Sequence, residues 1–450
     1  MTSSDVPPGK MVNSFNPDAL DGVSPENRRA IARRIRLLGP AYRLFYQDPV
    51  QVSRAQGTRL YDREGREYLD AYNNVAAVGH GHPQVVEAVA RQMATLCTHT
   101  RYIQDGILDY AEQLLPTFGG RIAASGHMMF TCTGSEANDL AMRIARHHTG
   151  RRGIICTSEA YHGNSDLTAS FSPSLGDQSP LGTWVRRVPA PDSYRGDPAA
   201  LGQVMAQAVA HQAWLLKRHG DGLAAFIADS LFSSDGIFAT PEVLAPVAQA
   251  VRDAGGLFVA DEVQSGFARS GDRMWGYQRH GIDPDIVTMG KPMGNGYPVA
   301  GIAVVHDVVA GFGRDNRYFN TFGGNGVAIA AAQATLDVIR AENVQDNVAR
   351  VGAKLRAGLV ALAARYPAMG DVRGAGLYIG VEMIADPINR IPDADATARI
   401  VNGLRARRLL ISATGPNANV LKIRPPLVFS SADADLLLAQ MAAVLSEIYD

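Results

Sequence analysis

Two short apolar segments of this chain end in residues that suit Schiff-base chemistry. Asp261 closes the run LFVAD, and Lys291 follows the run DIVTMG. A lysine at the end of a strand can condense with an aldehyde cofactor, and an aspartate on a neighbouring strand can keep a pyridinium nitrogen protonated. Pyridoxal phosphate needs both groups to act as an electron sink. The two segments therefore predict a pyridoxal-phosphate site at the ends of adjacent strands.

Two other segments could complete such a site. In TCTGSEAN, an apolar strand runs into Gly134 and Ser135 at the start of a helix, where backbone amides and a hydroxyl can bind a phosphate dianion. An ordinary helix cap explains the same residues. Tyr161 follows the run GIICT, where its ring could stack on a planar cofactor or simply pack in the core.

Other kinds of site are poorly supported. Lys291 is followed by Pro292, and the segment lacks the glycine spacing of a P-loop. The segment GAGLYIG lacks the strand, turn and helix of a dinucleotide fingerprint. His80 and His82 have no accompanying set of cysteine or acidic ligands, so we predict no metal site.

The elements that position these residues follow an α/β pattern. Helix-like segments alternate with apolar runs that are typical of a mainly parallel sheet covered on both faces: GIICT, AAFIADS, LFVADEV, IVTMG and AGIAVV. We predict a mobile arm over residues 1–22, a helix capped by Ser24 and a hairpin in TRLYDREGREYLDAY. The predicted division is an N-terminal arm and small-domain segment (1–72), a large cofactor-binding domain (73–335) and a C-terminal α+β small domain (336–450).

Composition limits the partners. The 450 residues carry 43 lysines and arginines against 44 aspartates and glutamates, which offers no electrostatic case for nucleic acid or an anionic membrane. The three cysteines lack disulfide or zinc spacing, which fits a reducing compartment. No segment is long and apolar enough to span a bilayer. We therefore expect a soluble, cytoplasmic protein that acts on small molecules.

Five ordered motifs resemble those of class III (ω-type) aminotransferases, which are fold-type I pyridoxal-phosphate enzymes: TGSEAN, AYHG, ADEVQSGFARSG, MGKPMGNG and NTFGGNGVA. The resemblance implies a large domain with a mainly parallel seven-stranded sheet, a smaller α+β domain and a homodimer with shared active sites. It also implies a role for each matching residue. Lys291 would form the Schiff base, Asp261 would hold the ring nitrogen, Gln264 the phenolic oxygen, Tyr161 would stack on the ring, Gly134 and Ser135 would bind the cofactor phosphate, and Thr321 would reach it from the other subunit.

The chain departs from this pattern on the substrate side. Lys422, in NVLKIRPP, stands where relatives that bind α-carboxylates usually have an arginine, whose fork matches a carboxylate. Asp229–Ser230 replaces the common Glu-Pro, and Ser234 replaces a glutamate of ornithine- and GABA-type relatives. These features are most similar to the ethanolamine-phosphate phospho-lyase branch, although that branch usually has glutamate at position 229.

We therefore predict a phospho-lyase that eliminates phosphate from phosphoethanolamine or a related O-phosphorylated amino alcohol. Cations and amides aimed at the substrate phosphate would assist this reaction. The candidates, each with a structural role as its alternative, are Lys422, Arg101, Asn73 and Asn74. An ω-aminotransferase that uses an amine and a keto acid is the second interpretation, and a cofactor-binding protein without catalysis is the third.

Overall fold

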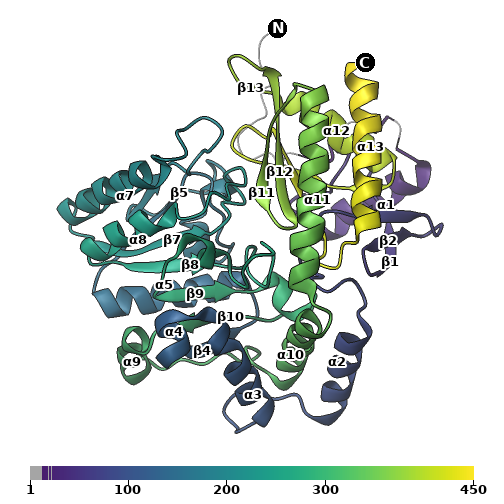
Figure 1. Ribbon diagram of the computed structural model, residues 1–450. Helices are drawn as coiled ribbons and strands as arrows, with labels where there is room; N and C mark the ends of the chain where they lie inside the picture. The colour runs from purple at the N-terminus through teal and green to yellow at the C-terminus, as the bar shows by residue number, and fades with distance from the viewer. Residues whose placement is uncertain (1–12, 19, 22) are drawn as a thin grey trace.

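The computed structural model of the protein describes residues 13–18, 20–21 and 23–450 (Figure 1). The rest of the predicted mobile arm lies outside these residues. Its described end is held in place, because the Phe15 amide donates to the Leu44 carbonyl at 2.8 Å and the Phe15 ring packs with Val23 and Ile31. The predicted mobility of the arm stays a prediction.

A seven-stranded sheet forms the centre of the larger part of the molecule, in the order β4-β10-β9-β8-β7-β5-β6. Neighbouring strands from β9 to β6 are parallel, and β10 runs antiparallel to both of its neighbours. The predicted seven-stranded, mainly parallel sheet is confirmed. The strands are β4 His127–Thr131, β5 Gly153–Thr157, β6 Val185–Val188, β7 Leu223–Asp229, β8 Leu257–Asp261, β9 Ile286–Met289 and β10 Ala300–Val304.

Helices cover this sheet. Every residue of β5, β8, β9 and β10 is buried, as expected for strands with both faces covered. Helices α7 and α8 pack together and contact β5, β6, β7 and β8, whereas α5 packs with α9 and contacts β4, β7, β8, β9 and β10. The helices of this part are α2 Pro83–Thr95, α3 Asp105–Leu114, α4 Gly120–Ser125, α5 Gly134–Thr149, α6 Asp166–Ala169, α7 Leu201–Arg218, α8 Leu244–Asp253, α9 His306–Asp315 and α10 Gly326–Ala341.

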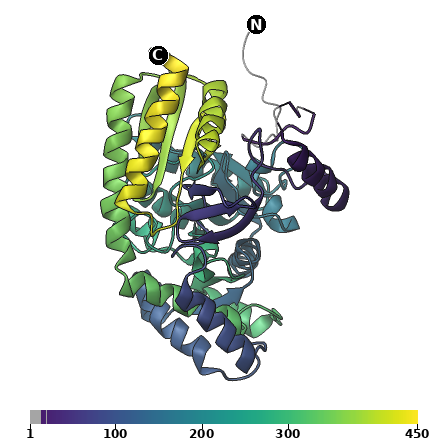
Figure 2. The ribbon, with the colours of Figure 1, turned by 90° about the vertical axis from the view of Figure 1, so that its right-hand side faces the viewer.

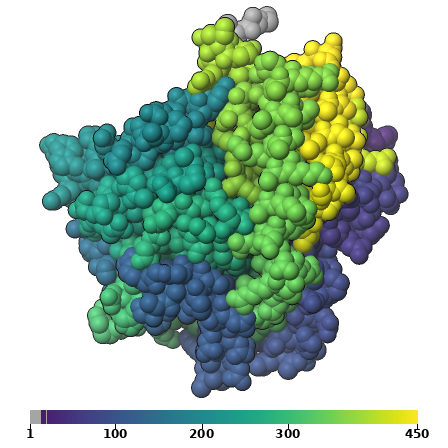
Figure 3. All heavy atoms as spheres, in the orientation of Figure 1, coloured from purple at the N-terminus to yellow at the C-terminus, as the bar shows by residue number. Residues whose placement is uncertain are grey.

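The C-terminal segment forms a second sheet, in the order β11-β12-β16-β15, with β13 paired to β12. Helices α11 and α13 contact each other and lie side by side on its outer surface (Figures 1 and 3). The bounds are α11 Val344–Arg365, β11 Met369–Ala375, β12 Tyr378–Asp386, β13 Ile391–Pro392, α12 Ala394–Ala406, β15 Ser412–Thr414, β16 Val420–Ile423 and α13 Ser431–Tyr449. The predicted domain boundaries stay a prediction, and the one at residue 335 falls within α10.

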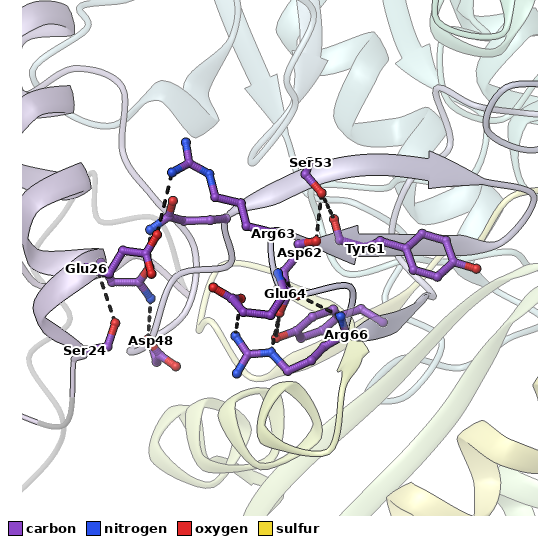
Figure 4. Close-up of polar contacts among 12 residues, drawn as sticks. Ser24, Glu26, Asp48, Ser53, Tyr61, Asp62, Arg63, Glu64 and Arg66 are labelled. Carbon is purple, nitrogen blue, oxygen red and sulfur yellow. Dashed lines mark hydrogen bonds and ion pairs between the residues drawn. The ribbon is translucent and has the colours of Figure 1, made fainter.

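A third sheet joins the two ends of the chain, because β14 (Leu409–Leu410) pairs with β3 in parallel. Its other strands are β1 (Val52–Gln56), β2 (Arg59–Asp62) and β3 (Glu67–Asp70), so the predicted hairpin is confirmed. Figure 2 shows this sheet between the C-terminal elements and α1 (Pro25–Leu38). Ser24 caps α1, as predicted. The hairpin turn is held by Asp62, which accepts from the amide of Glu64 at 3.1 Å and from Arg66 (Figure 4).

The sequence did not predict strand β6, and the structure shows what the glycine-rich segment GAGLYIG forms. Strand β6 was not predicted, because VRRV is half polar and occupies the edge of the sheet. The segment GAGLYIG forms the tight turn between β11 and β12, where Gly374 and Gly376 have φ of 132° and 52°.

No helix in the described part of the chain is long and apolar enough to cross a membrane.

Candidate active site

A cavity of about 190 Å³ lies at the carboxyl ends of β5, β7, β8 and β9. Parallel strands bring their carboxyl ends to one edge of the sheet, so residues far apart in the sequence meet there. The cavity brings together all the predicted cofactor residues except Thr321. Its lining consists of Gly134, Ser135, Asn138, Tyr161, His162, Gly163, Asp229, Asp261, Val263, Gln264 and Lys291.

Asp261 ends β8 as a buried, fully hydrogen-bonded carboxylate. It accepts from Asn138 Nδ2 at 3.0 Å, from the Val263 amide at 3.1 Å, and lies 2.7 Å from His162 Nδ1. Burial acts to raise the pKa of Asp261. The contact with His162 and the hydrogen bond from the Val263 amide outweigh this effect, so the pKa lies below the usual value for an aspartate. Asp261 therefore stays ionised at neutral pH and can hold a cationic ring nitrogen.

Lys291 follows β9 at a sharp turn, with a φ of 25°. Burial and the nearby Arg424 lower its pKa to about 8, against the opposite effect of Asp261 and Asp229. At pH 7 an amine with this pKa is neutral in roughly one molecule in ten, against fewer than one in a thousand for an exposed lysine. Lys291 therefore suits both Schiff-base formation and proton transfer.

The start of α5 forms the opposite wall. Thr133 caps the helix by accepting from the Glu136 amide, and Ser135 Oγ accepts from the Asn164 amide at 3.1 Å. A Cβ at Gly134 would lie 3.0 Å from the Val263 side chain, which explains a glycine at this position. The sixteen-residue helix directs its positive end at the cavity, where a phosphate would be stabilised.

Several buried polar atoms around the cavity have no hydrogen-bond partner among the described residues: His162 Nε2, Asn138 Oδ1 and Thr288 Oγ1. Buried polar groups without partners are uncommon, so they suggest that a polar ligand completes the site. Tyr161 is 37 % exposed, and burial and Asp261 raise the pKa of its hydroxyl. The residues present fit pyridoxal phosphate, with a lysine amine, a ring-nitrogen partner and an anion site around one cavity.

The residue that sequence reasoning missed is Arg424. Its Nη1 donates to Gln264 Oε1, its Nε donates to the Tyr72 carbonyl at 3.2 Å, and its guanidinium lies 5.0 Å from the Tyr72 ring. It is buried and lies close enough to Lys291 to affect that lysine's pKa. The signal was available, because Arg424 comes two residues after Lys422 and directly after β16, so an extended chain would project both side chains to the same face.

Lys422 lies on β16, beside the cavity and outside its lining. Its Nζ lies 3.5 Å from the Ser233 carbonyl, and its side chain is buried. Burial and Arg424 lower its pKa well below the usual value, while Asp229 opposes this shift. Asp229 ends β7, lines the cavity and accepts from the Leu231 and Ser233 amides at 3.0 and 3.1 Å.

The other predicted residues lie farther from the cavity lining. Asn73 donates to Asp70 at 3.0 Å, and the buried Asn74 side chain has no partner among the described residues. The Arg101 guanidinium lies 3.9 Å from the Phe319 ring, and both it and Thr321 are exposed. The structure does not bring these four residues into contact with Lys291, and their predicted roles stay predictions.

The remaining polar residues singled out in the sequence have structural contacts. Glu262, next to Asp261, accepts from Ser230 Oγ at 2.5 Å and from two backbone amides. His80 lies 2.7 Å from Asp70 and His82 lies 3.2 Å from Glu342. The two histidines therefore contact different carboxylates and do not converge on one point.

Comparison with known proteins identifies the family. The sequence model of the aminotransferase class-III family matches residues 45–445. A Drosophila melanogaster protein named alanine–glyoxylate aminotransferase 2-like is 39 % identical over 426 residues, which are 91 % of this chain and 85 % of the relative. Ethanolamine-phosphate phospho-lyase homolog 1 of Caenorhabditis elegans is 37 % identical over 421 residues, 89 % of each chain.

Solved structures agree with this result. A phospholyase from Arthrobacter in complex with phosphoethanolamine superimposes with a TM-score of 0.89 and 40 % identity, over 93 % of this chain and 99 % of that one. An aminotransferase from Bacillus anthracis superimposes with a TM-score of 0.84 and 26 % identity, over 94 % of this chain and 99 % of that one. The chain belongs to the class III aminotransferase family and is a pyridoxal-phosphate-dependent enzyme of fold type I.

Proposed function

We propose that this enzyme releases inorganic phosphate from phosphoethanolamine or a related O-phosphorylated amino alcohol. With one water molecule consumed, the other products are an aldehyde and ammonia. The observation that carries the proposal is the pair of buried basic side chains Lys422 and Arg424 beside Lys291, where an incoming phosphate would favour the protonated form of Lys422. The similarity to a phospholyase bound to phosphoethanolamine supports it.

The balance of charge around the cavity favours a dianionic substrate. Arg269 adds a further buried cation close to Arg424, and burial followed by Arg424 lowers its pKa to about 9. It donates to the Leu377 carbonyl at 3.1 Å and has no carboxylate partner among the described residues. Buried basic groups whose pKa values are lowered by burial and by one another are stabilised in their charged form by incoming negative charge. A phosphate supplies more of that charge than a carboxylate does.

Lys422 also selects against an α-carboxylate. An arginine at that position would offer a planar fork for two carboxylate oxygens, whereas the lysine ammonium offers one compact charge. Ser234, which could not pair with such an arginine, is part of the same loop as Ser233. The substrate side therefore suits a phosphate on the carbon beta to the amine.

We propose cofactor roles for residues that line the cavity. The start of α5, with Gly134 and Ser135, would bind its phosphate, and Asp261 would keep its ring nitrogen protonated. Gln264 would contact its phenolic oxygen, and Tyr161 would stack on its ring. When bound, the cofactor withdraws electrons from the amine carbon of the substrate.

Lys291 would move the protons of the reaction. Its neutral amine can take the proton from the substrate carbon that carries nitrogen, once that proton is acidified. The C–O bond to phosphate then breaks, and the phosphate leaves with the bonding electrons. Lys422 and Arg424 would stabilise the negative charge that develops on the leaving oxygen. Water then converts the remaining fragment to aldehyde and ammonia.

One assay tests the proposal. Purified enzyme is incubated with phosphoethanolamine and pyruvate, and inorganic phosphate, ammonia and alanine are measured together. We expect phosphate and ammonia in equal amounts and little alanine. The absence of phosphate release over a panel of phosphorylated amino alcohols would disprove the proposal.

An ω-aminotransferase that uses an amine and a keto acid is the second candidate. The same cavity could serve it, and the alanine–glyoxylate aminotransferase 2-like relative favours it. In the assay above it would produce alanine from pyruvate without phosphate. The predicted cytoplasmic location stays a prediction under either function.

We also propose that the enzyme is a homodimer in which Thr321 reaches the cofactor phosphate of the partner. Thr321 is exposed and lies between two exposed aromatic residues, Phe319 and Phe322, at 39 % and 68 %. Mixed dimers of Lys291→Ala and Thr321→Ala subunits test this arrangement. One site of such a dimer would contain both residues, so mixing should restore activity that neither variant has alone. If mixing restores none, the sites are not shared through Thr321.

A further inference from the structure

The loop after β7, residues Leu231–Phe238, has an unusual backbone. Phe232 and Ile237 have φ of 50° and 64°, and Gly236 has φ of 131°. Non-glycine residues avoid this region because their Cβ approaches the backbone too closely. A loop with two such residues keeps its conformation only when surrounding groups hold it.

Arg373, on β11, is the side chain that holds this loop from the small sheet. Its Nε donates to the carbonyls of Gly236 and Ile237 at 3.0 and 3.1 Å, and its Nη2 donates to Gly236 at 2.8 Å. Its Nη1 lies 2.9 Å from Asp371 and 2.7 Å from Glu382. The planar guanidinium thus contacts two consecutive carbonyls and two carboxylates, which a lysine cannot reproduce.

The other end of the loop is held from two further strands. Asp229 at the end of β7 accepts from the amides of Leu231 and Ser233. Thr414 on β15 donates to the Ser233 carbonyl at 2.9 Å. Ser233 therefore lies in a segment fixed by β7, β11 and β15, and its orientation depends on all three.

The loop presents one unpaired donor beside a cation. Ser233 is fully buried, and its carbonyl lies 3.5 Å from Lys422 Nζ. Its hydroxyl makes no hydrogen bond of ordinary length with a described residue, and it lies close enough to the Tyr378 hydroxyl to act on the pKa of that group. A buried hydroxyl without a partner costs free energy, so an oxygen-rich ligand that accepts from it is favoured. The Ser233 hydroxyl and Lys422, once protonated, would be two donors from neighbouring residues for a phosphate oxygen.

We propose that Ser233 donates its hydroxyl to the phosphate of the substrate, and that Arg373 is the positioning residue that holds Ser233 there. This inference rests on the proposed function, because it assigns two residues to the phosphate end of that substrate. Arg373 touches neither substrate nor cofactor and acts only through the loop.

The first test is Ser233→Ala in the holoenzyme. We expect KM for phosphoethanolamine to rise roughly tenfold, since a hydrogen bond to a charged group is lost, with a smaller change in kcat. The reaction of the bound cofactor with an unphosphorylated amine, followed by its absorbance, should keep its concentration dependence. An unchanged KM for phosphoethanolamine, or an equal rise for both amines, would overturn the proposal.

The second test compares Arg373→Lys with Asp371→Asn. The lysine keeps the charge but loses the fork, so we expect the same selective rise in KM as for Ser233→Ala. Asp371→Asn removes one outer partner of Arg373 and leaves its carbonyl contacts, so its KM should match the wild type. If both variants raise KM alike, the ion pairs rather than the loop explain the effect. If Arg373→Lys does not fold, the Ser233→Ala result decides.

Binding of inorganic phosphate to the holoenzyme separates this inference from the proposed function. Calorimetric titration should show weaker binding to Ser233→Ala than to wild type. Failure of the wild type to release phosphate from any phosphorylated amine would reject the function. Equal binding of inorganic phosphate by wild type and Ser233→Ala would reject the role of Ser233 whether or not the function holds.

Discussion

The cofactor side and the substrate side of the cavity are built differently. On the cofactor side, Asp261, Lys291 and the start of α5 follow β8, β9 and β4, three strands of one mainly parallel sheet. On the substrate side, Lys422 and Arg424 come from the small sheet and meet a loop that follows β7. The first side depends on one sheet and the second on how two sheets are packed together.

This difference separates chemistry from specificity. A parallel sheet keeps its strand ends in register through many hydrogen bonds, so groups at those ends stay in a constant arrangement. The contacts of the second side join separate elements through single side chains, such as Arg373 and Arg424. Substitutions there can change the substrate while the cofactor site remains intact.

The largest effect is expected from Lys291→Ala. Loss of the amine removes both the Schiff base and the proton carrier, so kcat should fall by roughly 10³-fold or more. The absorbance of the bound cofactor should shift at the same time. An active variant with unchanged absorbance would mean that the cofactor side is built on another residue.

Asp261→Asn should produce the next largest effect. The amide cannot stabilise a protonated ring nitrogen, so we expect kcat to fall by roughly 10²-fold while the cofactor absorbance is retained in part. Asp285→Asn is a suitable control, because Asp285 is buried just before the start of β9, away from the cavity, and contacts Arg121 and the Phe258 amide. Equal losses in the two variants would indicate a general effect of buried carboxylates.

Lys422→Met should affect the substrate side alone. Removal of the cation should raise KM for phosphoethanolamine by about tenfold or more, with the cofactor spectrum unchanged. Lys354→Met is the matched control, because that lysine contacts Asp435 on the surface. In Lys422→Arg the new guanidinium can bind a carboxylate through two hydrogen bonds. Alanine formation from pyruvate should therefore increase relative to phosphate release. A change in cofactor binding in Lys422→Met would contradict the separation of the two sides.

The pH dependence of cofactor binding should give the smallest effect. Because the pKa of Lys291 is about 8 in the folded protein and 10.5 without the shift, the amine becomes neutral as pH rises through 8. The rate at which the apoenzyme combines with pyridoxal phosphate should therefore rise several-fold through pH 8 and then level off. Between pH 8 and 10.5 the unfolded chain binds more protons than the folded one, so the stability of the apoenzyme should also rise.

Asp261→Asn offers a check on that titration. Asp261 acts to raise the pKa of Lys291, so the midpoint should move to lower pH in this variant. A midpoint near that of an exposed lysine would show that Lys291 is not desolvated as the structure describes.

The cofactor residues were predictable because each lies in a short motif at a strand end. Asp261 and Lys291 follow apolar runs, and Gly134 and Ser135 begin a helix after one. Asn138 lies four residues after Gly134, on the same helical face, and could have been found from that spacing. His162 stood out beside Tyr161 in the sequence, but its contact with Asp261 could not be predicted, because the two residues are distant in the sequence and follow different strands.

By itself the sequence determined the family, the cofactor and the strands that carry the cofactor residues, because local patterns decide where strands end and helices begin. Only the tertiary structure decided that Arg424 contacts Gln264, that Lys422 is buried against Ser233 and that Arg373 holds the loop between them. The physical reason is that these contacts arise where two sheets meet. Burial and the charge of neighbouring groups act there through space, and no local spacing records them.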